Sequence, residues 1–204
     1  MKIGIIGAGN VGSTLGRRWA AGGHEVLYGV RNPADEKYES LQGHAQIVST
    51  KEAAATADIV ALCVHWKAAE AAVDGIRDEL NGKVLMDCTN PVGADLGPIG
   101  SAAEQIQAWA PECTVVKSFN QIGANIMANP ILDGRKSVLF LAGDSKTACA
   151  TVEGLASELD FEVVTMPNLS YARHLEAVAM LWITMSFRLG YGREFAFSMT
   201  KRDA

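Results

Sequence analysis

A glycine-rich turn close to the N-terminus constrains this chain more than any other feature. An apolar run, Lys2 to Ile6, ends in Gly-Ala-Gly-Asn-Val-Gly, and a segment with helical apolar spacing follows. In this strand, turn and helix context the GxGxxG pattern predicts dinucleotide binding, because the glycines permit the turn, let a pyrophosphate approach the backbone and allow close helix packing. The alternative is a purely structural glycine turn. The residues expected to hold the cofactor here are Gly7, Ala8, Gly9, Asn10, Val11 and Gly12.

The end of the second predicted strand, Glu25 to Tyr28, distinguishes between the two nicotinamide dinucleotides. Proteins that bind NAD usually place an acid about 20 residues beyond the glycines, where it accepts a hydrogen bond from the ribose 2′-hydroxyl. This window holds no acid before Asp35; instead it holds Arg31, followed by Asn32. A guanidinium suits a 2′-phosphate through paired, charge-assisted hydrogen bonds. The sequence therefore predicts NADP(H) as cofactor, the alternative being that Arg31 is an ordinary surface arginine.

Composition narrows the class of protein. The chain has 204 residues, of which 49% are hydrophobic and 20% charged, as in ordinary soluble domains. Its formal net charge of −5 argues against nucleic-acid binding. No stretch approaches the ~20 apolar residues of a membrane span, and no signal-peptide core is present, so we expect a cytoplasmic protein with no membrane association. The four cysteines and four histidines lack metal-ligand spacing, which predicts no metal site.

Strand and helix patterns alternate along the whole chain. A continuous apolar run such as residues 59–64 is typical of a parallel strand covered on both faces. The alternation predicts an α/β fold, with a doubly wound parallel sheet of the Rossmann type and a C-terminal helical segment. We expect a single dinucleotide-binding domain over residues 1–204, in which residues 168–204 form a helical dimerisation segment.

The long C-terminal helix, expected over roughly residues 171–189, is apolar on most of its sides. One sheet can cover only one side of such a helix, which predicts that a second copy of the chain covers another side in a two-fold homodimer. The alternative is that Phe195 and Phe197 fold back and complete the coverage within one subunit.

Three predicted strand ends supply further candidates, because ligands of doubly wound sheets lie at the carboxyl ends of the strands. Among these candidates only His65 has a side chain that titrates near neutrality, so it is a candidate catalytic acid or pH sensor; alternatively, it caps the next helix or contacts ribose. Asn90 and Asn120 can orient the nicotinamide amide or its ribose. The other expected cofactor contacts are Val64, Pro91 in a rigid turn, and Trp66, which either walls the cleft or packs under a helix.

The sequence lacks an evident acid for reducing a carbonyl to an alcohol. There is no Tyr-x-x-x-Lys pair, and no His/Asp or Lys dyad stands out. Such a reduction needs a positioned proton donor, whereas hydride exchange between a nicotinamide and a flavin-like or quinone ring depends mainly on stacking and alignment. The pattern therefore favours hydride transfer between two cofactors.

These motifs together resemble the coenzyme F420-dependent NADP reductase family over nearly the whole chain. The matching elements are GAGNVG, GHEV, Gly29 before Arg31, Trp66, the Gly143-Asp144 pair and the C-terminal LEAVAMLW helix. The Lys-x-Phe-Asn motif ending at Asn120 is similar to a broader branch of NADP-binding homologues, and to the cytosolic reductase domain of six-transmembrane ferric reductases. The resemblance implies that the glycine turn and Arg31 hold NADP, that a deazaflavin exchanges hydride with it, and that the C-terminal helix pairs subunits.

The leading hypothesis is an NADPH-dependent oxidoreductase that transfers hydride between NADP(H) and a flavin-type, deazaflavin or quinone acceptor. Imine or pyrroline-5-carboxylate reduction is a weaker alternative, because the large helical dimerisation domain of those enzymes is missing. The rival from another class is a non-catalytic module that senses NADP or binds a partner.

Overall fold

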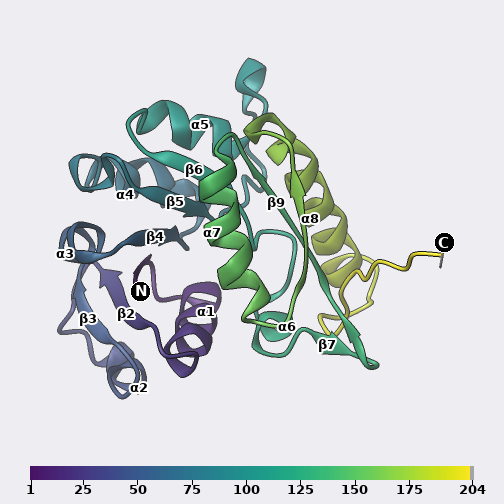
Figure 1. The fold of residues 1–204 in the computed structure, drawn as a ribbon, viewed down its shortest axis with the longest axis horizontal. Helices are drawn as coiled ribbons and strands as arrows, with labels where there is room; N and C mark the ends of the chain where they lie inside the picture. The colour runs from purple at the N-terminus through teal and green to yellow at the C-terminus, as the bar shows by residue number, and fades with distance from the viewer. Residues whose placement is uncertain (203–204) are drawn as a thin grey trace.

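An eight-stranded sheet organises the chain and places the N-terminal strand well inside it (Figure 1). In the computed structural model, which describes residues 1–202, the strand order is β10-β9-β6-β5-β4-β1-β2-β3. The apolar runs form the strands, as expected. Their bounds are β1 Lys2–Ile6, β2 Glu25–Val30, β3 Gln46–Ser49, β4 Ile59–Leu62, β5 Val84–Asp87, β6 Thr114–Lys117, β9 Val138–Gly143 and β10 Glu162–Met166.

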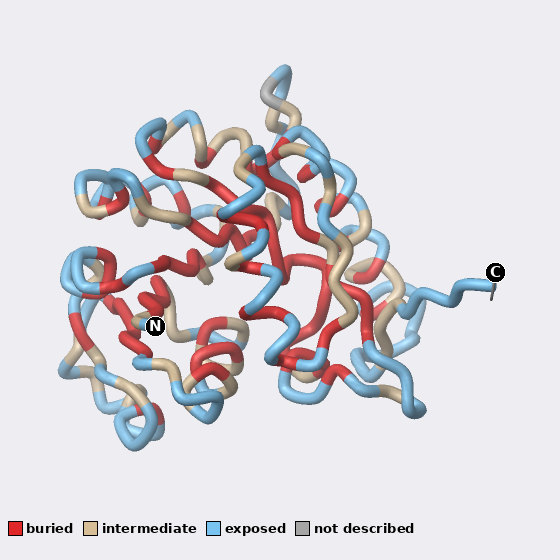
Figure 2. Tube along the Cα trace, viewed as in Figure 1, coloured by how far each residue is buried: buried red, intermediate tan, exposed pale blue. Residues whose placement is uncertain are grey.

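Helices cover both faces of this sheet, so its apolar strands are buried on two sides (Figure 2). One core, with Ile3 and Ile5, is covered by α1 (Asn10–Ala21), α6 (Ala124–Ala128) and α7 (Lys146–Ser157). The opposite core, with Ile6 and Leu62, is covered by α3 (Thr50–Thr56), α4 (Ala69–Asp74), α5 (Ala102–Trp109) and α8 (Ala172–Phe187). A short helix, α2 (Glu39–Gln42), lies beside β3.

The predicted doubly wound sheet is confirmed, except that its last two strands, β9 and β10, run opposite to the other six, which the sequence did not reveal. Strand β9 runs antiparallel to β6, and only Val116 and Lys117 of β6 pair with it. Because these are the last two residues of β6, most of β9 extends beyond that strand's carboxyl end. The connection to β9 contains α6 and a small hairpin of β7 (Ile131–Leu132) and β8 (Arg135–Lys136), which were not predicted either. Strand β9 therefore stands beside the edge where a ligand is expected.

The C-terminal residues fold back onto α8, as in the second of the alternatives considered for them, whereas pairing with a second copy stays a prediction. The main chain turns back after α8, and Phe195 stacks on Trp182 with ring centroids 5.4 Å apart. The Trp182 indole N–H also donates a hydrogen bond to the Phe195 carbonyl at 3.0 Å. Leu181 and Phe187 nevertheless keep 53% and 65% of their surface exposed. The fold-back therefore covers only part of the apolar surface of α8.

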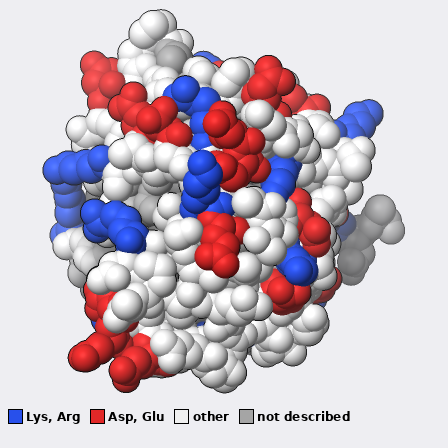
Figure 3. All heavy atoms as spheres, turned by 90° about the vertical axis from the view of Figure 1, so that its left-hand side faces the viewer, with Lys and Arg blue, Asp and Glu red and all other residues white. Residues whose placement is uncertain are grey.

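The surface over the β3 and α3 side of the molecule carries acidic and basic side chains in mixture (Figure 3). This mixing agrees with the modest formal net charge of −5. In residues 1–202, no helix combines the length and the apolar character that a membrane span requires.

Candidate functional site

The glycine turn lies at the switch point of the sheet, where β1 is flanked by β2 and β4. Gly7 has a φ of +101°, a conformation that favours glycine, and its N–H donates to the Gly29 carbonyl at 3.0 Å. A Cβ on Gly12 would lie 2.0 Å from the Gly7 carbonyl oxygen, so the third glycine is required for helix α1 to begin so close to β1. The strand, turn and helix predicted for this segment are confirmed.

The turn leaves room and free amides in front of helix α1. A Cβ on Gly9 would meet nothing within 4 Å, so this face of the turn is open. Ser13 N–H is bonded to the Gly9 carbonyl at 2.8 Å, but within residues 1–202 no backbone acceptor is recorded for the amides of Asn10 and Val11. The first turn of α1 has no acidic residue and Gly9 offers no side-chain cap. A pyrophosphate therefore fits the open face, where free N–H groups and the positive end of a 12-residue helix meet it.

Arg31 emerges at the same edge, one strand away. Ile6 of β1 pairs with Gly29 of β2, so the glycine turn and Arg31 leave neighbouring strands at the same end. Arg31 is exposed, and the carboxylate of Asp35 is already bonded to the Lys37 ammonium. Asn32 uses its side-chain oxygen to accept from Ala34 N–H at 3.3 Å, which shapes the turn after Arg31. Within residues 1–202 no ion pair holds the Arg31 guanidinium, so it could meet an added phosphate.

The segment after β4 lies directly across the switch point from the glycine turn. The Cys63 N–H donates to the Ile6 carbonyl at 2.9 Å, and a Cβ on Gly7 would come within 3.0 Å of Val64. His65 is exposed and starts a short 3-10 helix, which its side chain does not cap. Val64 is thus next to the turn, and the His65 imidazole is available to a ligand.

Trp66, next in the chain, stacks on Trp109 of α5, with ring centroids 5.4 Å apart and an interplanar angle of 22°. This contact matches the packing alternative that was considered for Trp66. Its contact with a cofactor stays a prediction.

Asn90 and Asn120 lie together at the ends of β5 and β6, as the strand-end argument predicted. The Asn90 side-chain N–H2 donates to the Asn120 carbonyl at 2.7 Å, and the Asn120 side-chain N–H2 donates to the Asn90 side-chain oxygen at 3.1 Å. Asn120 also donates to the Leu175 carbonyl at 3.2 Å, which links this pair to α8. Asn90 and Pro91 are partly exposed, whereas Asn120 is 5% exposed. Asn90 and Pro91 thus form the outer part of this edge, and Asn120 supports it from beneath.

A left-handed backbone at Phe119 turns the chain between β6 and Asn120. Phe119 has a φ of +55°, which is uncommon for a residue other than glycine, asparagine or aspartate. Its ring is 1% exposed and packs edge-on against Trp19 and Phe161 at centroid distances of 5.8 and 5.9 Å. Packing of the buried Phe119 ring stabilises this left-handed backbone conformation, which directs the Asn120 side chain towards Asn90.

A buried ion cluster lies under this asparagine pair, and the sequence interpretation missed it. The Lys117 ammonium is 2.8 Å from the Asp87 carboxylate and 3.0 Å from the Glu176 carboxylate, and the Lys117 and Asp87 side chains are fully buried. Burial disfavours the charged ammonium, but the Asp87 and Glu176 carboxylates outweigh it and raise the pKa of Lys117. A Lys/Asp pair therefore does exist at this edge, contrary to the sequence interpretation, although it is shielded from solvent. The available signal was one charged residue at the end of each of two apolar strands.

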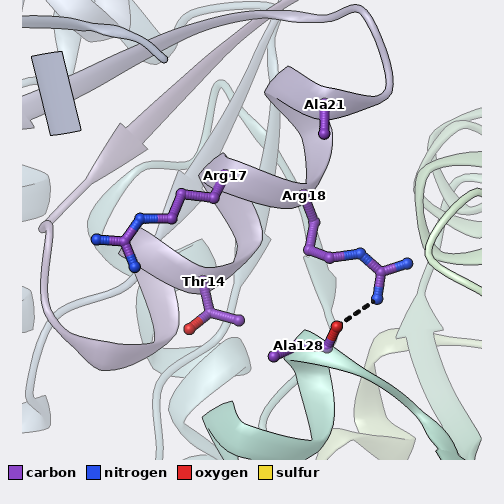
Figure 4. Close-up of a pocket in the computed structure, with 5 residues that line it drawn as sticks. All are labelled: Thr14, Arg17, Arg18, Ala21 and Ala128. Carbon is purple, nitrogen blue, oxygen red and sulfur yellow. Dashed lines mark hydrogen bonds between the residues drawn. The ribbon is translucent and has the colours of Figure 1, made fainter. Parts of the chain in front are cut away.

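A shallow hollow between α1 and α6 is a separate feature (Figure 4). The Arg17 and Arg18 side chains point in different directions there, and Arg18 donates to the Ala128 carbonyl at 3.0 Å. None of the predicted cofactor residues lines this hollow, which is formed by Thr14, Arg17, Arg18, Ala21 and Ala128.

The open glycine turn at the switch point of the sheet, with its helix-start amides, is typical of a dinucleotide-binding domain of the Rossmann type. The family model described as NADP oxidoreductase, coenzyme F420-dependent, matches residues 2–91. The F420-dependent NADP reductase of Methanothermobacter thermautotrophicus is 30% identical over 215 residues, which cover 92% of this chain and 90% of that protein. The chain belongs to this family of NADP-dependent oxidoreductases, as the resemblance implied.

Two further relatives extend the comparison. A protein of Arthrobacter sp. FB24, whose crystal structure bears the name of a proposed F420-dependent NADP reductase, is 28% identical with a TM-score of 0.87, covering 98% of this chain and 100% of that one. Metalloreductase STEAP3 of Rattus norvegicus is 32% identical over 182 residues. That match covers 88% of this chain but 36% of the metalloreductase, so the chain spans only a part of that longer relative.

Proposed function

We propose that this protein binds NADP(H) and transfers hydride between it and a flavin-type ring, with a deazaflavin as the first candidate. The observation that carries the proposal is the open face at Gly9 beside an exposed Arg31 at neighbouring strand ends. Bound there, NADPH would supply the hydride. The α1 amides would hold its pyrophosphate, and Arg31 would hold its 2′-phosphate. A flavin, a deazaflavin or a quinone would be the second substrate.

The acceptor class follows from what the partly exposed residues at this edge can do. His65 is the one imidazole among them, and Lys117 is enclosed by its carboxylates. Asn90 and Asn120 orient a bound ring rather than protonate it. This set favours an acceptor whose own ring takes up the hydride, and the names of the F420-dependent relatives favour a deazaflavin among such acceptors.

We further propose that α8 and the segment after it pair two subunits. Met180, Leu181, Phe187 and Tyr191 expose 39%, 53%, 65% and 66% of their surface. Met180, Leu181 and Phe187 lie on α8 and Tyr191 lies just beyond its end, and a group of exposed apolar side chains of this kind is typical of an interface. On this proposal residues 1–204 form one domain whose C-terminal segment, residues 168–204, carries the dimer contact. Cytoplasmic location stays a prediction.

The test of the reaction is the decay of NADPH absorbance in the presence of F420, FMN, FAD or a quinone, each supplied separately. We expect turnover with the deazaflavin and slower or no turnover with the others. Arg31→Ala should raise the KM for NADPH, whereas Arg77→Ala, which removes a surface arginine paired with Asp74, should leave it unchanged.

A non-catalytic NADP sensor is the second candidate, because the partly exposed ring-facing residues offer so few proton donors. That reading would replace the first if NADPH binds with micromolar affinity while none of the four acceptors is reduced.

A further inference from the structure

The Lys117 ammonium has as many partners as N–H donors, two of them at the end of β5 and one on α8. It has three N–H donors, and it contacts the Asp87 carboxylate at 2.8 Å, the Thr89 carbonyl at 2.7 Å and the Glu176 carboxylate at 3.0 Å. The second oxygen of Asp87 accepts from Thr89 N–H at 2.8 Å. Both carboxylate oxygens of Glu176 accept from Ala102 N–H, the first amide of α5, at 3.0 and 3.1 Å. The cluster thus joins β5, β6, α5 and α8.

This cluster fixes the starting points of both asparagine turns. Thr89 is held at its N–H by Asp87 and at its carbonyl by Lys117, so the residue that follows, Asn90, leaves from a fixed backbone. Lys117 itself is three residues before Asn120, with the left-handed Phe119 between them. Glu176 is next to Leu175, whose carbonyl accepts from Asn120. Asn90 therefore directly follows a residue whose carbonyl binds the Lys117 ammonium, and Asn120 is three residues after Lys117 itself.

The orientation of the two asparagine amides follows from the same contacts. The Leu175 and Asn120 carbonyls can only accept, so the amide groups that face them must be N–H2 groups. Asn120 then uses both of its N–H donors, one on Leu175 and one on Asn90. Asn90 keeps one N–H and part of its acceptor capacity, and it is the partly exposed member of the pair. A displacement of the cluster would therefore change the position of the Asn90 hydrogen-bond donor and acceptor that face a ligand.

We propose that Lys117 is a positioning residue for the nicotinamide half of the dinucleotide site, acting through the Asn90–Asn120 pair that it ties to helix α8. This inference rests on the proposed NADP(H) binding and deepens it. The adenosine half, formed by the glycine turn and Arg31, lies on β1 and β2 and has no recorded contact with the cluster within residues 1–202. Loss of the cluster should therefore weaken binding of the nicotinamide half of the ligand and leave binding of the adenosine half unchanged.

The ammonium keeps its charge throughout the pH range of an ordinary binding assay, because the two carboxylates raise the pKa of Lys117. Removing one member of such a buried cluster leaves an uncompensated charge, and the groups around it must shift. A shift of the asparagine turns by a fraction of an ångström is enough to weaken an oriented contact.

The experiment compares two ligands, NADPH and 2′,5′-ADP, by titration calorimetry. The second ligand carries the adenosine half without the nicotinamide half. The variants are Glu176→Gln, which can still accept from Ala102 N–H but offers Lys117 no charge, and Lys117→Met. Lys83→Met is the matched control, because the Lys83 ammonium is also bonded to carbonyls, those of Ala54 and Ala55, but precedes β5 at the opposite end of the sheet.

We expect both cluster variants to bind 2′,5′-ADP within about twofold of the wild-type affinity and NADPH about tenfold more weakly. The control should keep the wild-type ratio of the two affinities. An equal loss for both ligands, or no loss for either, would overturn the positioning role. If Lys117→Met does not fold, Glu176→Gln decides alone. A wild-type protein that binds neither ligand would instead refute the proposed function.

Discussion

The substitution Gly9→Ala, which adds one methyl group, should weaken NADPH binding and leave the stability of the fold nearly unchanged. Gly9 has φ −76° and ψ −166°, an extended conformation that alanine adopts freely, and its Cβ would meet nothing within 4 Å. Alanine gains about 0.4–1 kcal/mol through the unfolded chain. It loses a comparable few tenths to about 1 kcal/mol because it is a poorer N-cap than glycine. The free energy of unfolding of Gly9→Ala should therefore change by less than about 1 kcal/mol, or less than about 4 °C in Tm.

NADPH affinity should respond very differently, because that methyl group occupies the face that a pyrophosphate approaches. We expect a loss of at least about tenfold, equivalent to about 1.4 kcal/mol of binding free energy. The assay is thermal unfolding without ligand, followed by titration with NADPH. Gly154→Ala is the matched control, since its Cβ also meets nothing within 4 Å but lies on α7.

Gly12→Ala provides the opposite contrast. Its Cβ would lie 2.0 Å from the Gly7 carbonyl oxygen, and such overpacking costs about 1–3 kcal/mol. Its Tm should fall even without ligand. Wild-type NADPH affinity in Gly9→Ala would refute the placement of the pyrophosphate on this turn.

Three further predictions concern pH, thiol reactivity and assembly. Burial raises the pKa of Tyr28 to about 12, so as the pH rises the unfolded chain loses the tyrosine proton before the folded protein does. The free energy of unfolding should therefore decline between about pH 10 and 12, and urea unfolding of Tyr28→Phe should show a weaker decline than that of the wild type. Burial also raises the pKa of Cys113 to about 11, so at pH 8 it should react with a thiol reagent more slowly than the half-buried Cys63. Sedimentation at micromolar concentration should give a dimer mass that the double variant Leu181→Glu, Phe187→Glu reduces to a monomer mass; a wild-type monomer would contradict the pairing of α8.

Local sequence signals predicted the parts of this molecule that depend on neighbouring residues. The glycine turn was predictable from its local pattern, and two of its glycines, Gly7 and Gly12, have a steric reason in the structure. Strands such as β6 were predictable from short apolar runs, and α8 from its apolar spacing. Arg31 was proposed as a cofactor contact because the chain offers a cation in a window where an acid is usual, and this role stays a prediction.

The features that were missed depend on residues far apart in the chain. Asp87 and Lys117 are 30 positions apart and meet only because β5 and β6 pair in register. Glu176 joins them from α8, a helix much further along the chain. The directions of β9 and β10 were equally hidden, because an apolar run specifies burial and not which way a strand runs.

The central claim is that a 2′-phosphate is recognised by Arg31 beside a pyrophosphate site on the glycine turn. The most direct measurement is the ratio of the Kd values for NADH and NADPH, in the wild-type protein and in Arg31→Ala. We predict NADPH to bind at least about tenfold more tightly in the wild type and most of that difference to vanish in the variant. Equal affinities for the two dinucleotides in the wild type, or a preference unchanged by Arg31→Ala, would contradict the account.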